Sequence, residues 1–235
     1  MIKNHNNKIN LPQTRTEYIY NTLKESILRN ELKADQKINE KRLAEFFKVS
    51  KTPVREAIRT LAAEGFVKTN AHREARVAEV SYNELKNIFQ VLGTLDSLAI
   101  ELAVNKMTSR DINKLEDLIE KMKKKCGVKS VEEYLELNVA FHNKIWTCVP
   151  NELLQELLYL IRDRMLRYTY ARVLAMKDPA DLEKSIKQHI ELVNLLKQKN
   201  KEKLKDLIYR HRIAFIESSA FKKDVKKYLM SKKGI

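Results

Sequence analysis

The spacing of apolar residues predicts a mainly helical chain whose first helices lie near the N-terminus. After a polar segment at 1–13, which we expect to be a flexible tail, apolar residues from Tyr18 to Leu28 recur at three- and four-residue steps. This is the period of an amphipathic helix. A second, short helix is expected over NEKRLAEFF, with Asn39 in the N-cap position.

A third helix and a β-hairpin are expected next. Thr52 can cap the helix, Pro53 suits its first position because no backbone N–H is needed there, and Gly65 can end it. Two short β-like runs then flank a polar, basic centre, and their apolar residues are Phe66, Val67, Val77 and Val80. Such paired runs predict a β-hairpin.

From residue 81 onward the pattern is helical only, and this change marks the expected domain boundary. The S-x-x-E spacing at Ser81 and again at Ser130 predicts capping boxes, in which serine and glutamate side chains bond the first turn of a helix. The expected helices are 82–105, 109–125, 131–148, 151–176, 180–199, 201–219 and a last one near 221–231. We therefore expect a mainly α fold: an N-terminal winged helix-turn-helix at 14–80 and an all-α bundle of six to seven helices at 81–232.

The composition agrees with long helices, and the net charge suggests a negatively charged binding partner. The 235 residues include only 4 glycines and 4 prolines, and the net charge is +15. A surplus of this size suggests a polyanion such as nucleic acid. Two isolated cysteines fit a reducing cytoplasm, and neither a signal peptide nor a membrane span is expected, because no apolar run is long enough.

The third helix carries a charge pattern that suits DNA. Lys51, Arg55 and Arg59 are four residues apart, so they form one stripe opposite the apolar face. The helix N-terminus favours anions through its free N–H groups and its dipole. Such a helix can enter a DNA major groove, where an arginine can grip guanine through two hydrogen bonds. The other interpretation is a solvated face on which Arg55 pairs with an acid.

Further DNA contacts are expected on either side of this stripe. Ser50 and Thr52 lie with Lys51 at the helix start, within reach of phosphates or base edges. His72 and Arg73 lie at the tip of the hairpin and could reach the neighbouring minor groove or the backbone. A histidine at such a tip could equally be an idle surface residue.

Three histidines of the helical half form the second candidate site. His142, His189 and His211 lie on separate expected helices with apolar neighbours, and Asn138 precedes His142 by four residues on the same face. One such histidine is more often a hydrogen-bonded core residue than a metal ligand. Imidazoles on separate helices of a bundle can converge on one ion, however, and the Asn138 amide oxygen could be a fourth donor. This donor set suits Zn, Ni, Mn or Fe.

The stretch LAEFFKVSKTPVREAIRTLAAEGFV resembles the N-terminal DNA-reading domain of the GntR family of bacterial transcription regulators, over about residues 14–80. The resemblance implies a homodimer that binds a short palindromic operator. On the family pattern Arg55 reads a base, and Lys41 and Arg42 approach phosphates from the second helix. Lys51 stands where the family usually has arginine.

The wing also departs from the GntR pattern. The family usually carries an Arg-Gly pair there, whereas Arg73 is followed by Glu74 in this chain. An acid at the wing tip would be expected to weaken its contact with DNA.

The helical half is similar to the FCD effector domain found in the FadR branch of that family, over about residues 85–219. The family's metal ligands, carried over by position, are Asn138, His142, His189 and His211. The resemblance implies a divalent transition metal and a small-molecule effector such as a carboxylate.

One departure concerns the effector. The family often has an arginine that helps to hold a carboxylate, four residues before the acid that Asp96 matches, and Leu92 stands there instead. Arginines of the 151–176 helix could serve in its place, and these are Arg162, Arg164, Arg167 and Arg172. A solvated basic face is an equally good interpretation of them.

These observations predict a DNA-binding regulator, in most of the family a repressor, whose operator affinity is tuned by a metabolite near the metal. A basic nucleic-acid-binding scaffold without an effector is the alternative class. A metal-dependent enzyme is disfavoured, because the sequence has no H-E-x-x-H, G-x-S-x-G or P-loop motif.

Overall fold

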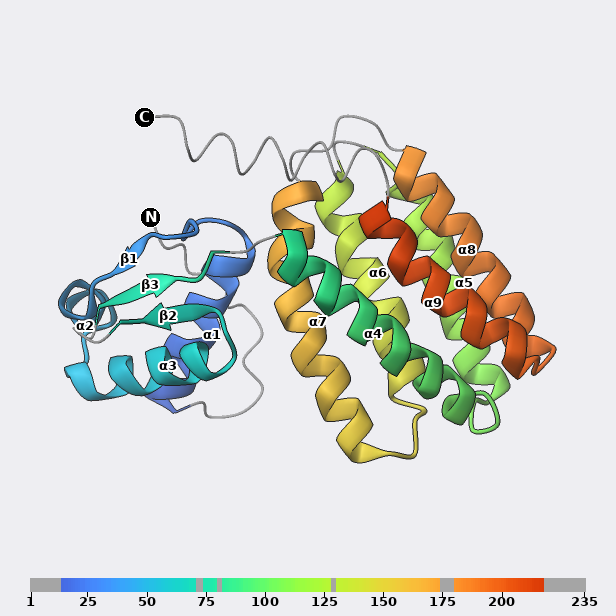
Figure 1. The fold of residues 1–235 in the computed structure, drawn as a ribbon, viewed down its shortest axis with the longest axis horizontal. Helices are drawn as coiled ribbons and strands as arrows, with labels where there is room; N and C mark the ends of the chain where they lie inside the picture. The colour runs from blue at the N-terminus through green and yellow to red at the C-terminus, as the bar shows by residue number, and fades with distance from the viewer. Residues whose placement is uncertain (1–13, 71–73, 80–81, 128–129, 174–179, 218–235) are drawn as a thin grey trace. The chain divides into compact units, whose positions relative to one another are not determined.

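A computed structural model of the chain describes residues 14–70, 74–79, 82–127, 130–173 and 180–217. The main division into two compact units falls between residues 81 and 82. The first unit holds helices α1 to α3 and a small sheet, and the second holds helices α4 to α9 (Figure 1). The expected mainly α fold, a winged helix-turn-helix followed by a helical bundle, is confirmed. The helix expected near 221–231 lies outside the described residues.

The first unit is built on three helices, and its core is formed by their apolar faces and by the sheet. The helices are α1 (Arg15–Leu28), α2 (Glu40–Phe47) and α3 (Lys51–Ala63). A capping box between Thr14 and Glu17 begins α1. Asn39 caps α2 as expected, because its side-chain oxygen accepts the backbone N–H of Arg42 at 3.1 Å.

The expected start of α3 was wrong by two residues. Ser50, not Thr52, occupies the N-cap position, and its side chain makes no capping hydrogen bond. Pro53 is therefore the third residue of the helix, which is tolerated because the first turn has no intrahelical acceptors for its N–H groups. Gly65 follows the helix with a φ of 80°, in the left-handed region that glycine enters without strain, as the sequence predicted.

The expected hairpin is present, and the structure adds a third strand. β2 (Val67–Thr69) and β3 (Ala75–Val77) pair antiparallel, and β1 (Lys37–Ile38) pairs with the other edge of β3, giving the order β1-β3-β2. Two residues are too few to show a period of two, so β1 could not be read from the sequence. The sheet closes the core formed with α1 and α3.

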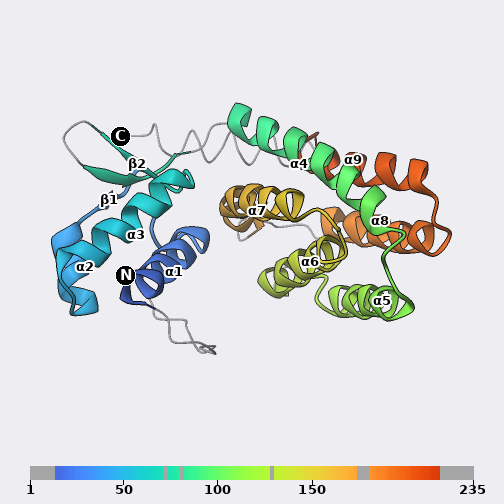
Figure 2. The same cartoon turned by 90° about the horizontal axis from the view of Figure 1, so that it is seen from below.

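The second unit contains six helices among its described residues, and their bounds lie close to those expected. They are α4 (Tyr82–Ala103), α5 (Ser109–Lys124), α6 (Val131–Trp146), α7 (Glu152–Val173), α8 (Ala180–Lys197) and α9 (Lys201–Glu217). α4 and α9 lie side by side in both views (Figures 1 and 2), α8 packs on α5 and α9, and α6 contacts α4 and α5. None of the described helices combines the length and apolar character needed to cross a bilayer.

Of the two expected capping boxes, the one at Ser130 is absent and the one at Ser81 is not tested. Ser130 precedes α6 with φ −117° and ψ 16° and makes no capping hydrogen bond, because this backbone is not the extended form that a cap requires. Its expected partner, Glu133, pairs instead with Lys125 at 2.5 Å. The first box lies outside the described residues, since Ser81 does. A capping box that the sequence prediction missed begins α5, between Thr108 and Asp111.

Candidate functional site: a basic reader helix and a buried histidine cluster

The exposed face of α3 presents the basic stripe. Lys51, Arg55 and Arg59 are exposed, and the opposite face of the helix is buried through Val54, Ala57, Ile58 and Leu61. The apolar face fixes the helix in the core, so the stripe must point to solvent. The N-terminal turn, with its free N–H groups, lies at the Lys51 end and adds to the attraction for anions.

Arg55 has an acidic partner on the neighbouring helix. Its Nε donates to Oε2 of Glu40 on α2 at 2.7 Å, while Glu56 accepts the hydroxyl of Thr16 instead. Arg55 is therefore exposed and also paired with an acid, as the interpretation of a solvated face expected. About half of the side chain remains exposed, at 53%. An ion pair this open holds the guanidinium in place but contributes little energy, so DNA can replace it.

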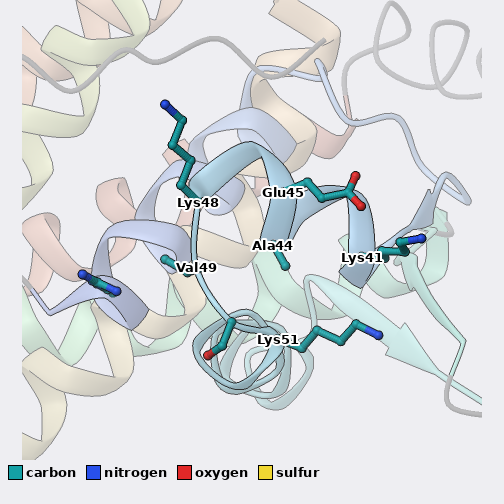
Figure 3. Close-up of a pocket in the computed structure, with 8 residues that line it drawn as sticks. Lys41, Ala44, Glu45, Lys48, Val49 and Lys51 are labelled. Carbon is teal, nitrogen blue, oxygen red and sulfur yellow. The ribbon is translucent and has the colours of Figure 1, made fainter.

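An open pocket of about 480 Å³ lies at the turn that connects α2 and α3 (Figure 3). Its lining includes Arg15, Lys41, Lys48 and Lys51, with Glu45 as the one acid among them. Figure 3 shows Lys41 and Lys51 extending toward the same side of the turn. A concave surface with four cations is suited to a phosphate backbone.

The remaining expected DNA contacts of α2 and α3 are also accessible. Lys41, Arg42, Ser50 and Thr52 are exposed. His72 and Arg73 lie outside the described residues, so the structure does not place them.

The acid of the wing is held by two basic side chains. Glu74 pairs with Lys37 at 2.7 Å and with Arg76 at 3.3 Å. The hydrogen bond from Lys37 and then that from Arg76 hold the pKa of Glu74 below its usual value. Its charge is thus balanced locally, and the repulsion of DNA expected from an acid at this position is reduced.

In the second unit, three imidazoles from three helices meet in the interior. His142 of α6, His189 of α8 and His211 of α9 are buried, and one ring nitrogen of each lies within 4.8 Å of the others. The Nε2 atoms of His142 and His189 are 3.3 Å apart. Two nitrogens bound to one ion at about 2.0–2.1 Å in tetrahedral geometry would lie about 3.3 Å apart, so this pair fits a common metal.

The three histidines are neutral at pH 7 because burial disfavours the imidazolium. Burial, together with the nearby charge of Arg212, lowers the pKa of His189 to about 3. Burial is also the main cause of the lowered pKa of His142 and of His211. A neutral imidazole keeps a lone pair for a metal, so no proton has to be displaced on binding.

The outer contacts of the cluster are incomplete. Nδ1 of His211 lies 2.8 Å from Oε1 of Gln188, the type of contact that orients a metal-binding imidazole. Nδ1 of His142 and Nδ1 of His189 are buried and have no hydrogen-bond partner among the described residues. Asn138, the expected oxygen donor, is half-buried on α6 one turn before His142.

Asp96 and Arg212 form a buried ion pair that the sequence did not suggest. Asp96 of α4 accepts Nε1 of Trp146 and Nε of Arg212, both at 2.5 Å. Asp96 and Arg212 are 2% and 5% exposed. Arg212 follows His211 directly on α9, so the pair joins α4 and α9 at the histidines.

The arginines expected to bind an effector from α7 are placed only in part. Arg162 donates to Asn143 and to Asp163, each at 2.8 Å, and its guanidinium stacks on Tyr159. The guanidinium of Arg162 therefore makes contacts within the helical domain rather than standing free. Arg164 also has partners, and the side chains of Arg167 and Arg172 lie outside the described part of α7.

A winged helix-turn-helix with an exposed basic helix, followed by an all-helical domain with a buried histidine cluster, defines a ligand-responsive DNA-binding regulator. Residues 15–77 match the bacterial regulatory proteins of the gntR family, and residues 87–214 match the FCD domain. The chain belongs to the GntR family of transcription regulators and carries an FCD effector-binding domain. It is a regulator rather than an enzyme.

Two curated relatives and one solved structure are similar to most of the chain. The chain is 32% identical over 178 residues to the Nta operon transcriptional regulator of Aminobacter aminovorans, covering 75% of this chain and 80% of the relative. It is 27% identical over 206 residues to the HTH-type transcriptional regulator YdhC of Bacillus subtilis, covering 87% and 90%. The structure of E. coli McbR/YncC is similar at a TM-score of 0.71 and 28% identity, covering 87% of this chain and 97% of that one.

Proposed function

We propose that the protein is a homodimeric repressor whose affinity for a palindromic operator depends on a metal ion and a small-molecule effector in the FCD domain. The observation that carries this proposal is the convergence of three buried, neutral imidazoles from α6, α8 and α9. The Nε2 atoms of His142 and His189 lie 3.3 Å apart, a separation that suits two nitrogens bound to one ion.

The DNA contact is assigned to α3 and the turn before it. Arg55 reads a base from the major groove, while Lys51 and Arg59 on the same stripe, with Lys41 and Arg42 of α2, bind phosphates. A homodimer places two such helices about 34 Å apart, one turn of DNA, so that both enter the same face of a palindrome. The basic pocket at Lys41 and Lys51 supports the phosphate contacts.

The ion is assigned to His142, His189 and His211, with the amide oxygen of Asn138 as a fourth donor. Nitrogen and neutral oxygen donors fit zinc, nickel, manganese or iron. When bound, such an ion supplies a Lewis acid with open coordination positions for an effector. With Asn138 in place of an aspartate, the site has one negative charge fewer and holds the ion less tightly.

Regulation requires that the effector distinguish two arrangements of the protein. An effector can change operator affinity only by its difference in affinity for the DNA-competent state and the other state. In a repressor, the effector prefers the state that does not fit the operator, and its binding releases DNA.

Metal content and native mass test this function directly. We expect purified protein to hold about one transition-metal ion per chain and to have the native mass of a dimer. Substituting His189→Gln should remove most of the metal, whereas the control Lys187→Gln, an exposed residue on the same helix, should retain it. Metal-free wild-type protein after growth with the four metals, or unchanged metal in the His189 variant, would contradict the assignment.

A further inference from the structure

Three basic side chains form a row across the outer face of the wing sheet, and we call them the wing row. Arg76 on the central strand β3 lies directly opposite Lys37 on β1 and directly opposite Lys68 on β2 (Figure 1). Residues that lie directly opposite each other on paired strands project from the same face of the sheet. The residues that flank them on the other face are apolar and buried, so the wing row lies on the exposed face.

The wing row is electrostatically unfavourable within the protein alone, because like charges directly opposite each other on neighbouring strands repel. Glu74 lies on the same face of β3 and bridges Lys37 and Arg76, and Arg76 also donates to the backbone oxygen of Asp35 at 3.0 Å. These contacts relieve the repulsion at one end of the row. Lys68, at the other end, is exposed, and no described residue pairs with its ammonium group. An anion from outside the protein would offset the repulsion there.

The position of the wing row is fixed relative to the reader helix α3. Strand β2 follows α3 closely in the chain, and the buried side chains of the sheet, Ile38, Val67 and Val77, belong to the same core as those of α3. A duplex held by α3 presents its phosphodiester backbone to the surface of this small domain. About half to two-thirds of the hydrogen bonds between proteins and DNA go to phosphate and sugar, so basic side chains on a rigid surface beside a reader helix are suited to this contact.

We propose that the wing row is a second phosphate-binding surface, in which Lys68 contacts the DNA backbone and Glu74 withholds Lys37 from it. The inference goes beyond the proposed function, which assigns the DNA contacts to α2 and α3. The pair of Lys37 with Glu74 is short, at 2.7 Å, but Lys37 is 61% exposed, so water and phosphate can reach its ammonium group. Glu74 therefore limits the number of cations that DNA meets on the wing, whatever the sequence of the duplex.

The competing account is that these charges only stabilise the sheet. The ion pairs of Glu74 with Lys37 and Arg76 hold β1 against β3, and Lys68 would then be a solvated side chain. The two accounts differ in the salt dependence of DNA binding, because each contact of a cation with a phosphate releases counterions. A cation that stabilises the sheet without contacting DNA leaves this dependence unchanged.

The salt dependence is measured with full-length protein and a labelled duplex of unrelated sequence, by fluorescence anisotropy at several salt concentrations. Lys68→Gln should reduce the steepness of log affinity against log salt by about 0.9 for each subunit that contacts DNA. Glu74→Gln should increase it by about the same amount, because Lys37 gains a phosphate, and adding Lys37→Gln to that variant should restore the wild-type value. Over a fourfold range of salt, each change corresponds to roughly 3.5-fold in affinity.

Two controls make the same changes of net charge outside the sheet. Lys201→Gln on α9 and Glu191→Gln on α8 replace exposed residues of the helical domain, and both should keep the wild-type salt dependence. Circular dichroism and urea unfolding of each variant confirm that it is folded. Because every substituted side chain lies on the surface or keeps its shape as an amide, we expect all variants to fold.

The inference is overturned if Lys68→Gln keeps the wild-type salt dependence, if Glu74→Gln does not increase it, or if the two controls change it equally. Lys51→Gln on α3 separates this outcome from a failure of the proposed function, which predicts a reduced salt dependence for that variant. A reduction for Lys51→Gln without one for Lys68→Gln refutes the wing row alone. Wild-type behaviour of Lys51→Gln contradicts the proposed phosphate contact of α3 instead.

Discussion

Substituting Arg55→Ala should remove specific operator binding and leave the fold intact. The side chain is 53% exposed on the face of α3 opposite the core, and its ion pair with Glu40 is open to water. Exposed pairs of this kind contribute at most about 1 kcal/mol. Because Glu40 is also partly exposed, at 26%, leaving it without a partner costs little, and we expect the free energy of unfolding to change by less than about 1 kcal/mol.

The effect on DNA should be much larger. A bidentate arginine–guanine contact contributes about 1–3 kcal/mol of discrimination between bases, which corresponds to roughly 5- to 150-fold in affinity. The ion pair with Glu40 must be given up on binding, which lowers the net gain of each contact, but the proposed homodimer makes two such contacts on one palindrome, so both losses add. Affinity for unrelated DNA should fall only slightly, because each subunit loses only one positive side chain that can interact with phosphates.

Fluorescence anisotropy at fixed salt measures both quantities, with a labelled palindrome from the DNA flanking the protein's own gene and an unrelated duplex of the same length. The control is Arg29→Ala, which breaks a similar partly exposed pair with Glu25 on α1. The assignment of Arg55 is refuted if its alanine variant prefers the palindrome as strongly as wild type does. It is also refuted if urea unfolding shows that the fold was lost.

Three further predictions concern stability. Asp96→Asn should lower the free energy of unfolding by about 3–5 kcal/mol, because it leaves Arg212 as a buried charge without its acid. Asp206→Asn, which breaks an exposed pair, should lower it by about 1 kcal/mol or less, and urea unfolding compares the two variants. Gly65→Ala, at a φ of 80°, should cost roughly 1–2 kcal/mol in the same assay, and Gly127→Ala, where an added methyl group meets nothing within 4 Å, should be nearly neutral. Metal-free protein should lose stability as the pH falls below roughly 6.5, by about 1.4 kcal/mol per pH unit for each buried histidine. The reason is that burial lowers the pKa of these imidazoles and keeps them neutral, whereas the unfolded chain binds their protons. Urea unfolding curves between about pH 7 and 5 that show no such slope would contradict this prediction.

The sequence predicted those features that depend on local periodicity and residue type. The apolar face of α3 placed Arg55 on its exposed side, and the helical spacing around His142 and His189 placed both imidazoles toward the interior. In each case one helix face has to be buried, and helical periodicity then determines which face each of the remaining residues occupies.

The features that the sequence did not predict depend on contacts between distant segments. The pair of Glu40 with Arg55 joins two helices, and that of Asp96 with Arg212 joins residues 116 positions apart. Neither has a local signal, because an arginine beside a histidine on a helix looks the same whether it is buried or solvated. The start of α3 was misplaced for a different, local reason. A proline is accepted at more than one position of a helix's first turn, so Pro53 did not fix the boundary.

The most direct test of the account is the operator affinity of the same protein with and without its ion. Chelator-stripped wild type and His189→Gln are mixed with the labelled palindrome, and zinc, nickel, manganese or iron is titrated into each. The account predicts that at least one ion changes the operator affinity of the wild type by roughly fivefold or more, the usual scale of coupling between sites, and leaves that of the variant unchanged. If the wild type responds to none of the four ions, or the variant responds equally, the helical domain does not control DNA binding through this cluster.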